Sequence, residues 1–307
     1  MRCAWHPGYS IDLPEGHSFP MRKYAHLREI LAQERLVADE HWMEPDEVRL
    51  ELLEAVHESR YVRSILAGEL DESTRKRLGF PWSEALVRRA RLGAGGTLLA
   101  CEAALRHGLA ANLAGGTHHA FADRGEGYCV FNDVAVALVE LLRQGRVRSA
   151  MVVDLDVHQG NGTASIFANE PRVRTFSMHG RKNFPLVKER STRDVELEDG
   201  TGDEEYLEIL ARELPAFLDA PRAPGAARAD LVVSLGGVDT TADDRFGRMA
   251  MSAQGVYLRE RYVLEELRAR QLATVVTLGG GYLRAGARAT ADLHAAAHRA
   301  ARDLGLP

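Results

Sequence analysis

Two carboxylates and an imidazole stand within five residues of one another, at Asp154, Asp156 and His158. They follow the apolar run Ala150–Val153, and alternation along an extended chain would place all three on one face. Such groups repel one another unless a cation or hydrogen bonds hold them. No Lys or Arg interleaves them, which disfavours the alternative of a salt-bridged strand end. The DxDxH pattern therefore predicts half of a metal site.

A third ligand is expected from another strand end. Asp239 directly follows the apolar run Leu231–Leu235 and two glycines, although an aspartate alone there is often only a cap. With Asp156 and His158 it forms a set of three protein ligands that leaves room for water, as catalytic metal sites do. One nitrogen and carboxylate oxygens suit Zn²⁺, with Fe²⁺, Co²⁺ and Mn²⁺ as alternatives.

Two of the 12 histidines are adjacent, His118 and His119, and they follow Gly115-Gly116. Adjacent side chains of an extended strand point apart, but a turn at the glycines can direct both rings into one pocket. Imidazole is the natural acid or base near neutral pH, and a carboxylate on its far nitrogen raises its basicity. Asp154 could orient His118. Asn161 could orient His119 without adding charge.

A glycine triplet, Gly279-Gly280-Gly281, follows the apolar run Thr274–Leu278 and precedes Tyr282. It lacks the later glycine and the helix-opening context of a dinucleotide-binding loop. We therefore expect the glycines to bring backbone close to the metal pocket. They would present a tyrosine hydroxyl that can donate to a developing oxyanion.

The elements that must position these residues alternate between strands and helices. Expected strands are Arg2–Trp5, Ala150–Val153, Val173–Met178, Leu231–Leu235 and Thr274–Leu278. Expected helices are Arg22–Arg35, Pro45–Val56, Ser83–His107, Phe131–Leu142, Glu204–Phe217, Val256–Arg270 and Ala285–Ala301. Continuous apolar strands and this alternation predict a doubly wound parallel sheet. The residues above follow its strands, at the edge where open α/β sheets bind ligands.

The amino-acid composition and net charge exclude several classes of protein. The chain is 45% hydrophobic and 27% charged, which excludes a disordered or fibrous chain. A net charge of −5 predicts no bulk attraction to nucleic acid or to anionic membranes. Three scattered cysteines and no apolar leader or span favour a reduced, cytoplasmic protein. The segment from Pro221 to Arg228 is expected to be a loop.

Five motifs together resemble the zinc-dependent histone deacetylase family, most closely its compact bacterial members near class IV. In chain order they are Gly115–His119, Gly127–Asp133, Asp154–His158, Asp239 within its GGVDTTADD segment, and Gly279–Tyr282. The resemblance implies one arginase-like α/β domain over residues 1–307, with about eight parallel strands. It implies Asp156, His158 and Asp239 as zinc ligands, His118 and His119 as the acid/base pair, and Tyr282 as the group that polarises the carbonyl.

The resemblance also implies a narrow acyl-lysine channel walled by Gly127, Tyr128, Phe184 and Gly280. It suggests a structural K⁺ or Na⁺ held by Asp154, Asp156, His158, Ser177 and Met178. Asn161 stands where class I enzymes carry an aspartate, as in class II, and Tyr128 replaces the commoner channel phenylalanine. No residue matches the rim aspartate with which class I enzymes hold a peptide backbone.

The implied reaction is metal-dependent hydrolysis of an N-acyl-lysine amide in a protein or peptide. An acetylpolyamine or another small N-acyl amine is the alternative substrate. A ureohydrolase would need a second metal and an aspartate where Gly160 stands. A non-catalytic acyl-lysine binder would not need the histidine pair and the tyrosine. The oligomeric state cannot be read from the sequence.

Overall fold

Eight parallel strands form one sheet in the computed structural model, which describes residues 1–220 and 229–307. The order across the sheet is β2-β1-β3-β8-β7-β4-β5-β6. This confirms the expected architecture. The strands are β1 (Arg2–Ala4), β2 (Trp42–Met43), β3 (Leu109–Asn112), β4 (Ala150–Asp154), β5 (Val173–Gly180), β6 (Arg193–Leu197), β7 (Leu231–Gly236) and β8 (Ala273–Leu278).

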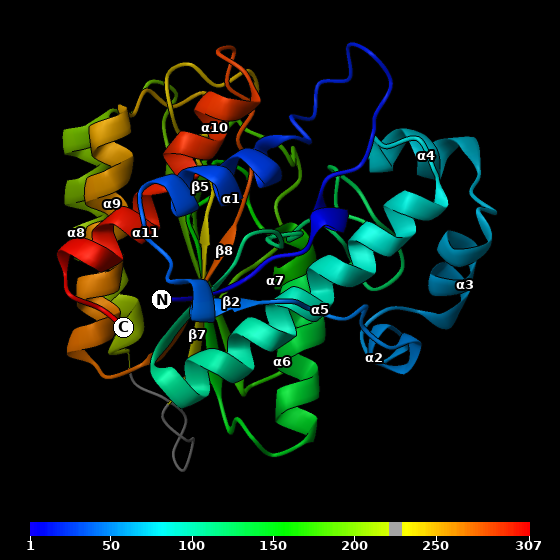
Figure 1. The fold of residues 1–307 in the computed structure, drawn as a ribbon, viewed down its shortest axis with the longest axis horizontal. Helices are drawn as coiled ribbons and strands as arrows, with labels where there is room; N and C mark the ends of the chain where they lie inside the picture. Colours follow the sequence, from blue (N-terminus) through cyan, green and yellow to red (C-terminus); the bar gives the residue numbers. More distant parts are fainter. Residues whose placement is uncertain (221–228) are drawn as a thin grey trace.

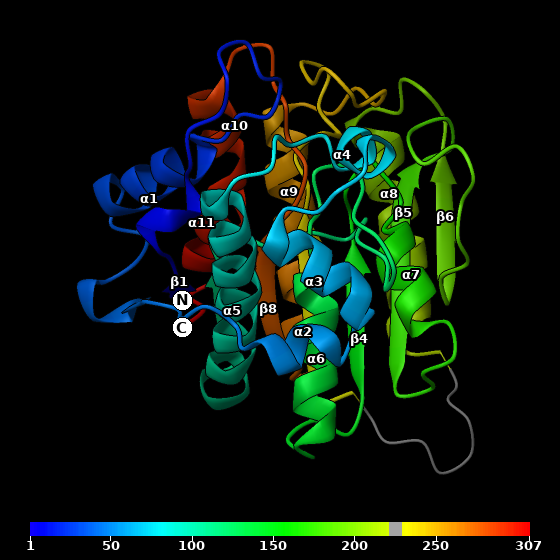
Figure 2. The same ribbon diagram turned by 90° about the vertical axis from the view of Figure 1, so that its right-hand side faces the viewer.

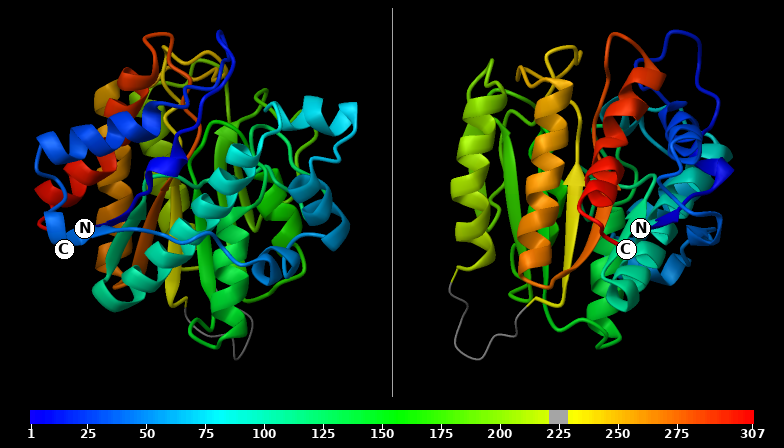
Figure 3. Two further views of the ribbon diagram at one scale, coloured as in Figure 1. Left: turned by 45° about the vertical axis from the view of Figure 1, so that its right-hand side comes forward. Right: turned by 60° about the vertical axis from the view of Figure 1, so that its left-hand side comes forward.

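Helices cover both faces of the sheet (Figures 1 and 2). The α-helices are α1 (Lys23–Gln33), α2 (Leu50–Glu54), α3 (Ser59–Ala67), α4 (Glu72–Leu78), α5 (Glu84–His107), α6 (Asp133–Arg143), α7 (Asn161–Phe167), α8 (Asp203–Leu218), α9 (Ala253–Ala269), α10 (Ala287–His294) and α11 (Ala296–Asp303). Short 3₁₀ turns lie at Pro7–Tyr9 and Asp39–His41. Figure 3 shows the sheet between a layer containing α8, α9 and α11 and a layer containing α5 and α6.

The core lies on both faces of the central strands, which is why these strands are apolar throughout. Val152 and Val233 pack with α5 and α6, whereas the alternate residues Met151, Val153 and Val232 pack with α8 and α9. Strands covered on both faces can bury every residue, so an apolar run rather than an alternating pattern marks them. The chain ends lie near one another beside β1 (Figure 2).

The predicted elements need some corrections. The expected helix Pro45–Val56 is wrong over its first residues, because only Leu50–Glu54 is helical. The expected helix Ala285–Ala301 is divided into α10 and α11 at Ala295. The sequence missed the short strands β2, β3 and β6 and the helices α3, α4 and α7. The expected loop 221–228 lies outside the described residues.

Strand order decides where the chemistry gathers. The strands β3, β8, β7 and β4 are neighbours in the middle of the sheet, although they come from distant parts of the chain. The segments that follow these four strands carry His118 and His119, Tyr282, Asp239, and Asp156 with His158, respectively. All four segments therefore meet at one edge. Outside 221–228, no helix combines the length and apolar character needed to cross a membrane.

Candidate active site

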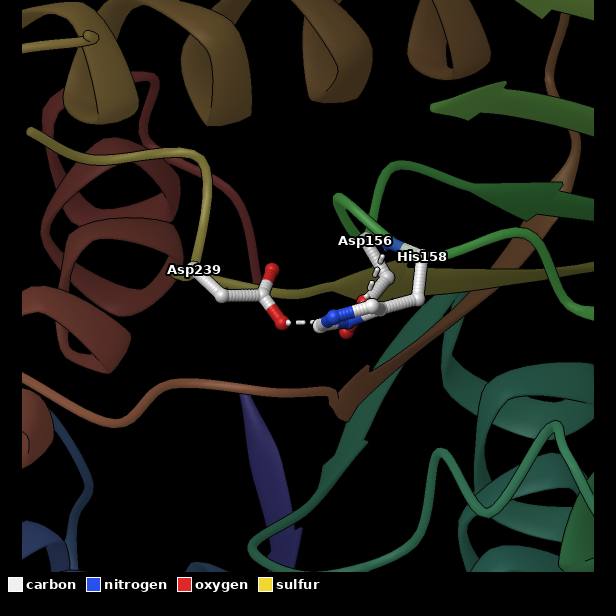
Figure 4. A group of neighbouring side chains, drawn as sticks. All are labelled: Asp156, His158 and Asp239. Carbon is white, nitrogen blue, oxygen red and sulfur yellow. Dashed lines mark hydrogen bonds and ion pairs between the residues drawn. The ribbon is translucent and has the colours of Figure 1, made fainter. Parts of the chain in front are cut away.

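Asp156, His158 and Asp239 form one buried group at the carboxyl ends of β4 and β7 (Figure 4). Nδ1 of His158 lies 3.0 Å from Oδ1 of Asp156 and 3.1 Å from Oδ2 of Asp239. One potential ligand atom from each residue lies within 4.8 Å of the others. Both carboxylates are fully buried. The three residues that the sequence nominated as ligands are thus brought together.

The predicted strand Ala150–Val153 is confirmed as β4, but the segment after it does not continue in the extended conformation assumed for Asp154, Asp156 and His158. β4 ends at Asp154, because side-chain oxygens then take over the backbone donors. Oδ1 of Asp154 accepts from the amide of Asp156 at 3.1 Å, and Oδ1 of Asp156 accepts from the amide of His158 at 2.9 Å. These bonds favour turns over strand pairing. Leu155 and Val157 still point into the core, as expected.

The chemistry of this group fits a divalent cation. Burial and the adjacent Asp156 carboxylate raise the pKa of Asp239. Two buried carboxylates that face one imidazole nitrogen are costly without a positive charge between them. Backbone is packed closely around the group: the amide of Gly280 donates to Oδ2 of Asp156 at 2.5 Å, and a Cβ on Gly280 would collide with Oδ2 of Asp239. The donor set could therefore hold a divalent metal ion.

The histidine pair is positioned by the loop after β3. Gly115 and Gly116 adopt φ of 80° and 68°, which side chains other than glycine rarely tolerate. Asp133, at the start of α6, accepts from the amides of Gly116 at 3.1 Å and Thr117 at 2.7 Å. This bracing brings the rings of His118 and His119 to a centroid separation of 4.1 Å.

The two histidines have different partners and opposite pKa shifts. Nδ1 of His118 lies 2.6 Å from Oδ2 of Asp154, and Nδ1 of His119 lies 2.7 Å from Oδ1 of Asn161. Burial disfavours a charged ring, but the carboxylates of Asp154 and Asp156 raise the pKa of His118 to about 9. Burial, with the neighbouring His118 and His158, lowers the pKa of His119 well below its usual value. His118 therefore holds a proton more readily, and His119 less readily, than an isolated imidazole.

Tyr282 follows the glycine segment after β8 and lines a cavity together with His119 and His158. Its amide donates to Oδ2 of Asp244 at 2.6 Å, and its ring packs against Phe19 and Phe246 at centroid distances of 5.9 and 4.9 Å. Its hydroxyl makes no hydrogen bond with the described part of the chain. Burial and the nearby Asp239 and Asp156 carboxylates raise its pKa well above the ordinary value. The hydroxyl thus keeps its proton and can donate a hydrogen bond to a ligand.

A cavity of about 580 Å³ leads from the surface to His158 of the Asp156, His158 and Asp239 group. Its lining includes His119, His158 and Tyr282, and also the expected wall residues Gly127, Tyr128 and Phe184. The ring centroid of Phe184 lies 4.9 Å from that of His119. Gly280 lines an adjoining cavity of about 40 Å³ together with His118 and Asp156, and both cavities are lined by His119, His158 and Tyr282.

The proposed monovalent-cation residues are also neighbours. Ser177 pairs in register with Asp154, and the next residue along β5, Met178, is buried. The Ser177 hydroxyl lies 2.9 Å from Nδ1 of His179. A K⁺ or Na⁺ ion here stays a prediction.

Sequence reasoning missed four supporting residues. Asp133 and Asp244 brace the histidine and tyrosine loops, and both belong to motifs that were already noted. Glu126 accepts from Nδ2 of Asn161 at 2.7 Å. Lys23 is fully buried and donates to the carbonyl of Gly279 at 2.9 Å. No local pattern marks Lys23 or Glu126, because their partners lie far away in the sequence.

Residues 17–298 match the profile of the histone deacetylase domain. The chain belongs to the histone deacetylase family. An uncharacterised protein of Picosynechococcus sp. is 42% identical over 98% of both chains. A probable deacetylase of Methanothermobacter thermautotrophicus is 33% identical over an alignment that covers 78% of this chain and 73% of the relative. Histone deacetylase 2 of Arabidopsis thaliana is 28% identical and covers 90% of this chain and 72% of its own length.

The fold of this family member has a close counterpart among solved structures. The HDA15 HD domain superposes with a TM-score of 0.76 at 21% identity, over 97% of this chain and 90% of that one. This likeness establishes the arginase/deacetylase fold. Membership in the family implies deacetylase or deacylase activity, which is hydrolysis of an amide bond.

Proposed function

We propose that this histone deacetylase family member is a zinc-dependent deacylase that hydrolyses the amide of an N-acyl-lysine or a related N-acyl amine. The observation that carries the proposal is that His119 and Tyr282 line one cavity with His158, which belongs to the Asp156, His158 and Asp239 cluster. One nitrogen and two carboxylates suit zinc, which would polarise the amide carbonyl and lower the pKa of a water molecule. We further propose that residues 1–307 form one catalytic domain.

Proton transfer and stabilisation of the oxyanion are assigned to side chains of the protein. Neutral His119 accepts the proton of the attacking water, and Asn161 keeps its ring oriented through Nδ1. The hydroxyl of Tyr282 donates a hydrogen bond to the oxyanion that develops on the substrate. His118, held cationic by Asp154, adds positive charge nearby, and one histidine of the pair protonates the departing amine. The products are a free amine and a carboxylate.

The structure favours one catalytic metal over two. A ureohydrolase would need a further ligand at position 160, but a Cβ on Gly160 would collide with Oδ2 of Asp154. A non-catalytic reader would have no use for a proton-transfer pair aimed into the cavity.

The test combines metal analysis with turnover. We expect the zinc-loaded protein to release acetate from an Nε-acetyl-lysine peptide and to lose that activity with a chelator. We expect His119→Ala to keep its zinc but to lose about 10²–10⁴-fold in rate, the usual share of acid–base catalysis. Absence of turnover by the zinc-loaded protein across a panel of N-acyl-lysine and N-acyl-amine substrates would refute the function.

A further inference from the structure

Four cationic side chains line the outer part of the cavity, and we call them the cationic mouth: Lys76, Arg77, Lys182 and Arg248. Lys76 and Arg77 lie in the last turn of α4, which Figure 2 shows at the end of the sheet toward which the strands run. Lys182 follows β5, and Arg248 lies between β7 and α9. Three segments distant in sequence thus place like charges around one opening.

The acidic side chain in the described lining, Glu126, does not neutralise the mouth. Its Oε1 accepts from Nδ2 of Asn161 at 2.7 Å, and its Oε2 lies 3.6 Å from Nε of Arg124. Only 14% of the Glu126 side chain is exposed. Both carboxylate oxygens of Glu126 therefore already have partners within the protein, Asn161 and Arg124.

The carboxylates near the cationic mouth do not neutralise all of its positive charge. Lys182 and Arg248 share a single partner, Asp199, at 3.7 and 3.4 Å. Lys76 forms an ion pair with Glu72 at 2.6 Å. The guanidinium of Arg77 donates to the neutral hydroxyl of Thr74, at 3.3 Å, and forms no ion pair with the described residues. Exposed ion pairs contribute little. The four cations of the mouth have two carboxylate partners, Glu72 and Asp199, which leaves a surplus of positive charge to meet charge on a ligand.

The mouth opposes the charge of the whole molecule. The chain carries a net charge of −5, yet its catalytic opening is positive. A cleft lined by one sign of charge concentrates ligands of the opposite sign. Apolar surface adjoins it, since Leu186 is 90% exposed and Phe184 and Phe246 are about two-fifths exposed. The aliphatic stem of an acylated amine could pack there.

We propose that the preferred substrate carries a negatively charged group on the amine side of the scissile amide, which the cationic mouth binds. This inference rests on the proposed function and deepens it. It selects among the substrate classes, because an acetylated polyamine carries the same charge as the mouth and would be repelled. The anionic group is either an acidic side chain that flanks an acyl-lysine or the main-chain carboxylate of a free acyl-lysine.

The experiment uses zinc-loaded protein and matched acetyl-lysine peptides whose flanking residues are two Glu, two Gln or two Lys. Free Nε-acetyl-lysine with its α-amine blocked, and the corresponding carboxamide, distinguish the second source of charge. Binding of labelled peptides is followed by fluorescence polarisation and hydrolysis by kcat/KM. We expect the Glu peptide to exceed the Lys peptide by about tenfold at low salt, and the ratio to shrink in about 0.5 M salt because exposed charges are screened.

Variants then assign the preference to the mouth. Arg77→Gln and Lys182→Gln should each reduce the Glu-to-Lys ratio by about two- to threefold, as expected for exposed charge pairs. Arg106→Gln is the matched control, because Arg106 lies in the last turn of α5, before β3 begins, at the opposite edge of the sheet. It should leave the ratio unchanged.

The outcomes separate this inference from the proposed function. Hydrolysis without charge preference, or a preference that Arg77→Gln and Lys182→Gln leave intact, overturns the cationic mouth while the deacylase stands. A preference for the Glu peptide in binding without hydrolysis supports the mouth and refutes the deacylase. Failure of every peptide and amino acid to bind overturns the inference.

Discussion

Replacing Tyr282 by Phe should lower turnover strongly while leaving the fold and the metal group intact. Phe keeps the ring that packs against Phe19 and Phe246 and removes only the hydroxyl. That hydroxyl makes no hydrogen bond with the described residues, so its loss leaves no protein partner unsatisfied. What disappears is one donor to the developing oxyanion. Such a donor is worth about 2.7–4 kcal/mol, or about 10²–10³ in kcat.

The assay measures kcat and KM of Tyr282→Phe with the best acyl substrate, together with zinc content and thermal unfolding. KM should change much less than kcat, because a neutral carbonyl accepts a weaker hydrogen bond than an oxyanion does. The melting temperature should stay within about 1 °C of the parent, since no internal hydrogen bond is lost.

Tyr61→Phe is a matched control with the opposite signature. The hydroxyl of Tyr61 donates to the carbonyl of Val130 at 2.7 Å, outside the proposed catalytic groups. Its removal should cost about 1 kcal/mol of stability, a fall of about 1.5 °C in the melting temperature of a chain of this length, without a large change in kcat. A kcat for Tyr282→Phe within about threefold of the parent would refute the role of the hydroxyl.

Three further changes probe the metal group and the base. Asp239→Ala should abolish tight zinc binding and turnover, because it removes one of the three proposed ligands; full zinc occupancy measured by metal analysis would contradict the ligand set. Asn161→Asp should move the acidic limb of the kcat/KM profile upward by about one pH unit or more, because a carboxylate at Nδ1 stabilises protonated His119 and raises its pKa; an unchanged limb would argue against this pairing as a control of the base. Gly280→Ala should weaken zinc binding about tenfold or more, since its Cβ would displace Asp239. Titration with a competing chelator measures the zinc affinity, and an unchanged affinity would contradict this expectation.

The central strands could be read from the sequence because local composition decides them. Ala150–Asp154 and Leu231–Gly236 are buried on both faces, so almost every residue in them must be apolar. β6 is an edge strand whose Arg193, Asp194 and Glu196 are not buried, so its letters resemble those of a loop. The polar helix α4 buries little more than Leu78, and its pattern was correspondingly weak.

The residues of the candidate site could also be predicted from the sequence, because a DxDxH segment and a tandem histidine pair after glycines are local patterns. Their assembly was not, since only the strand order β3-β8-β7-β4 brings Asp239 to His158 and Tyr282 to both. The same holds for charge. Composition yields a net charge of −5, whereas folding places Arg77, Lys182 and Arg248 around one opening. Hydrophobic periodicity acts over a few residues, but electrostatic fields and metal coordination depend on distance in space, which the tertiary structure alone determines.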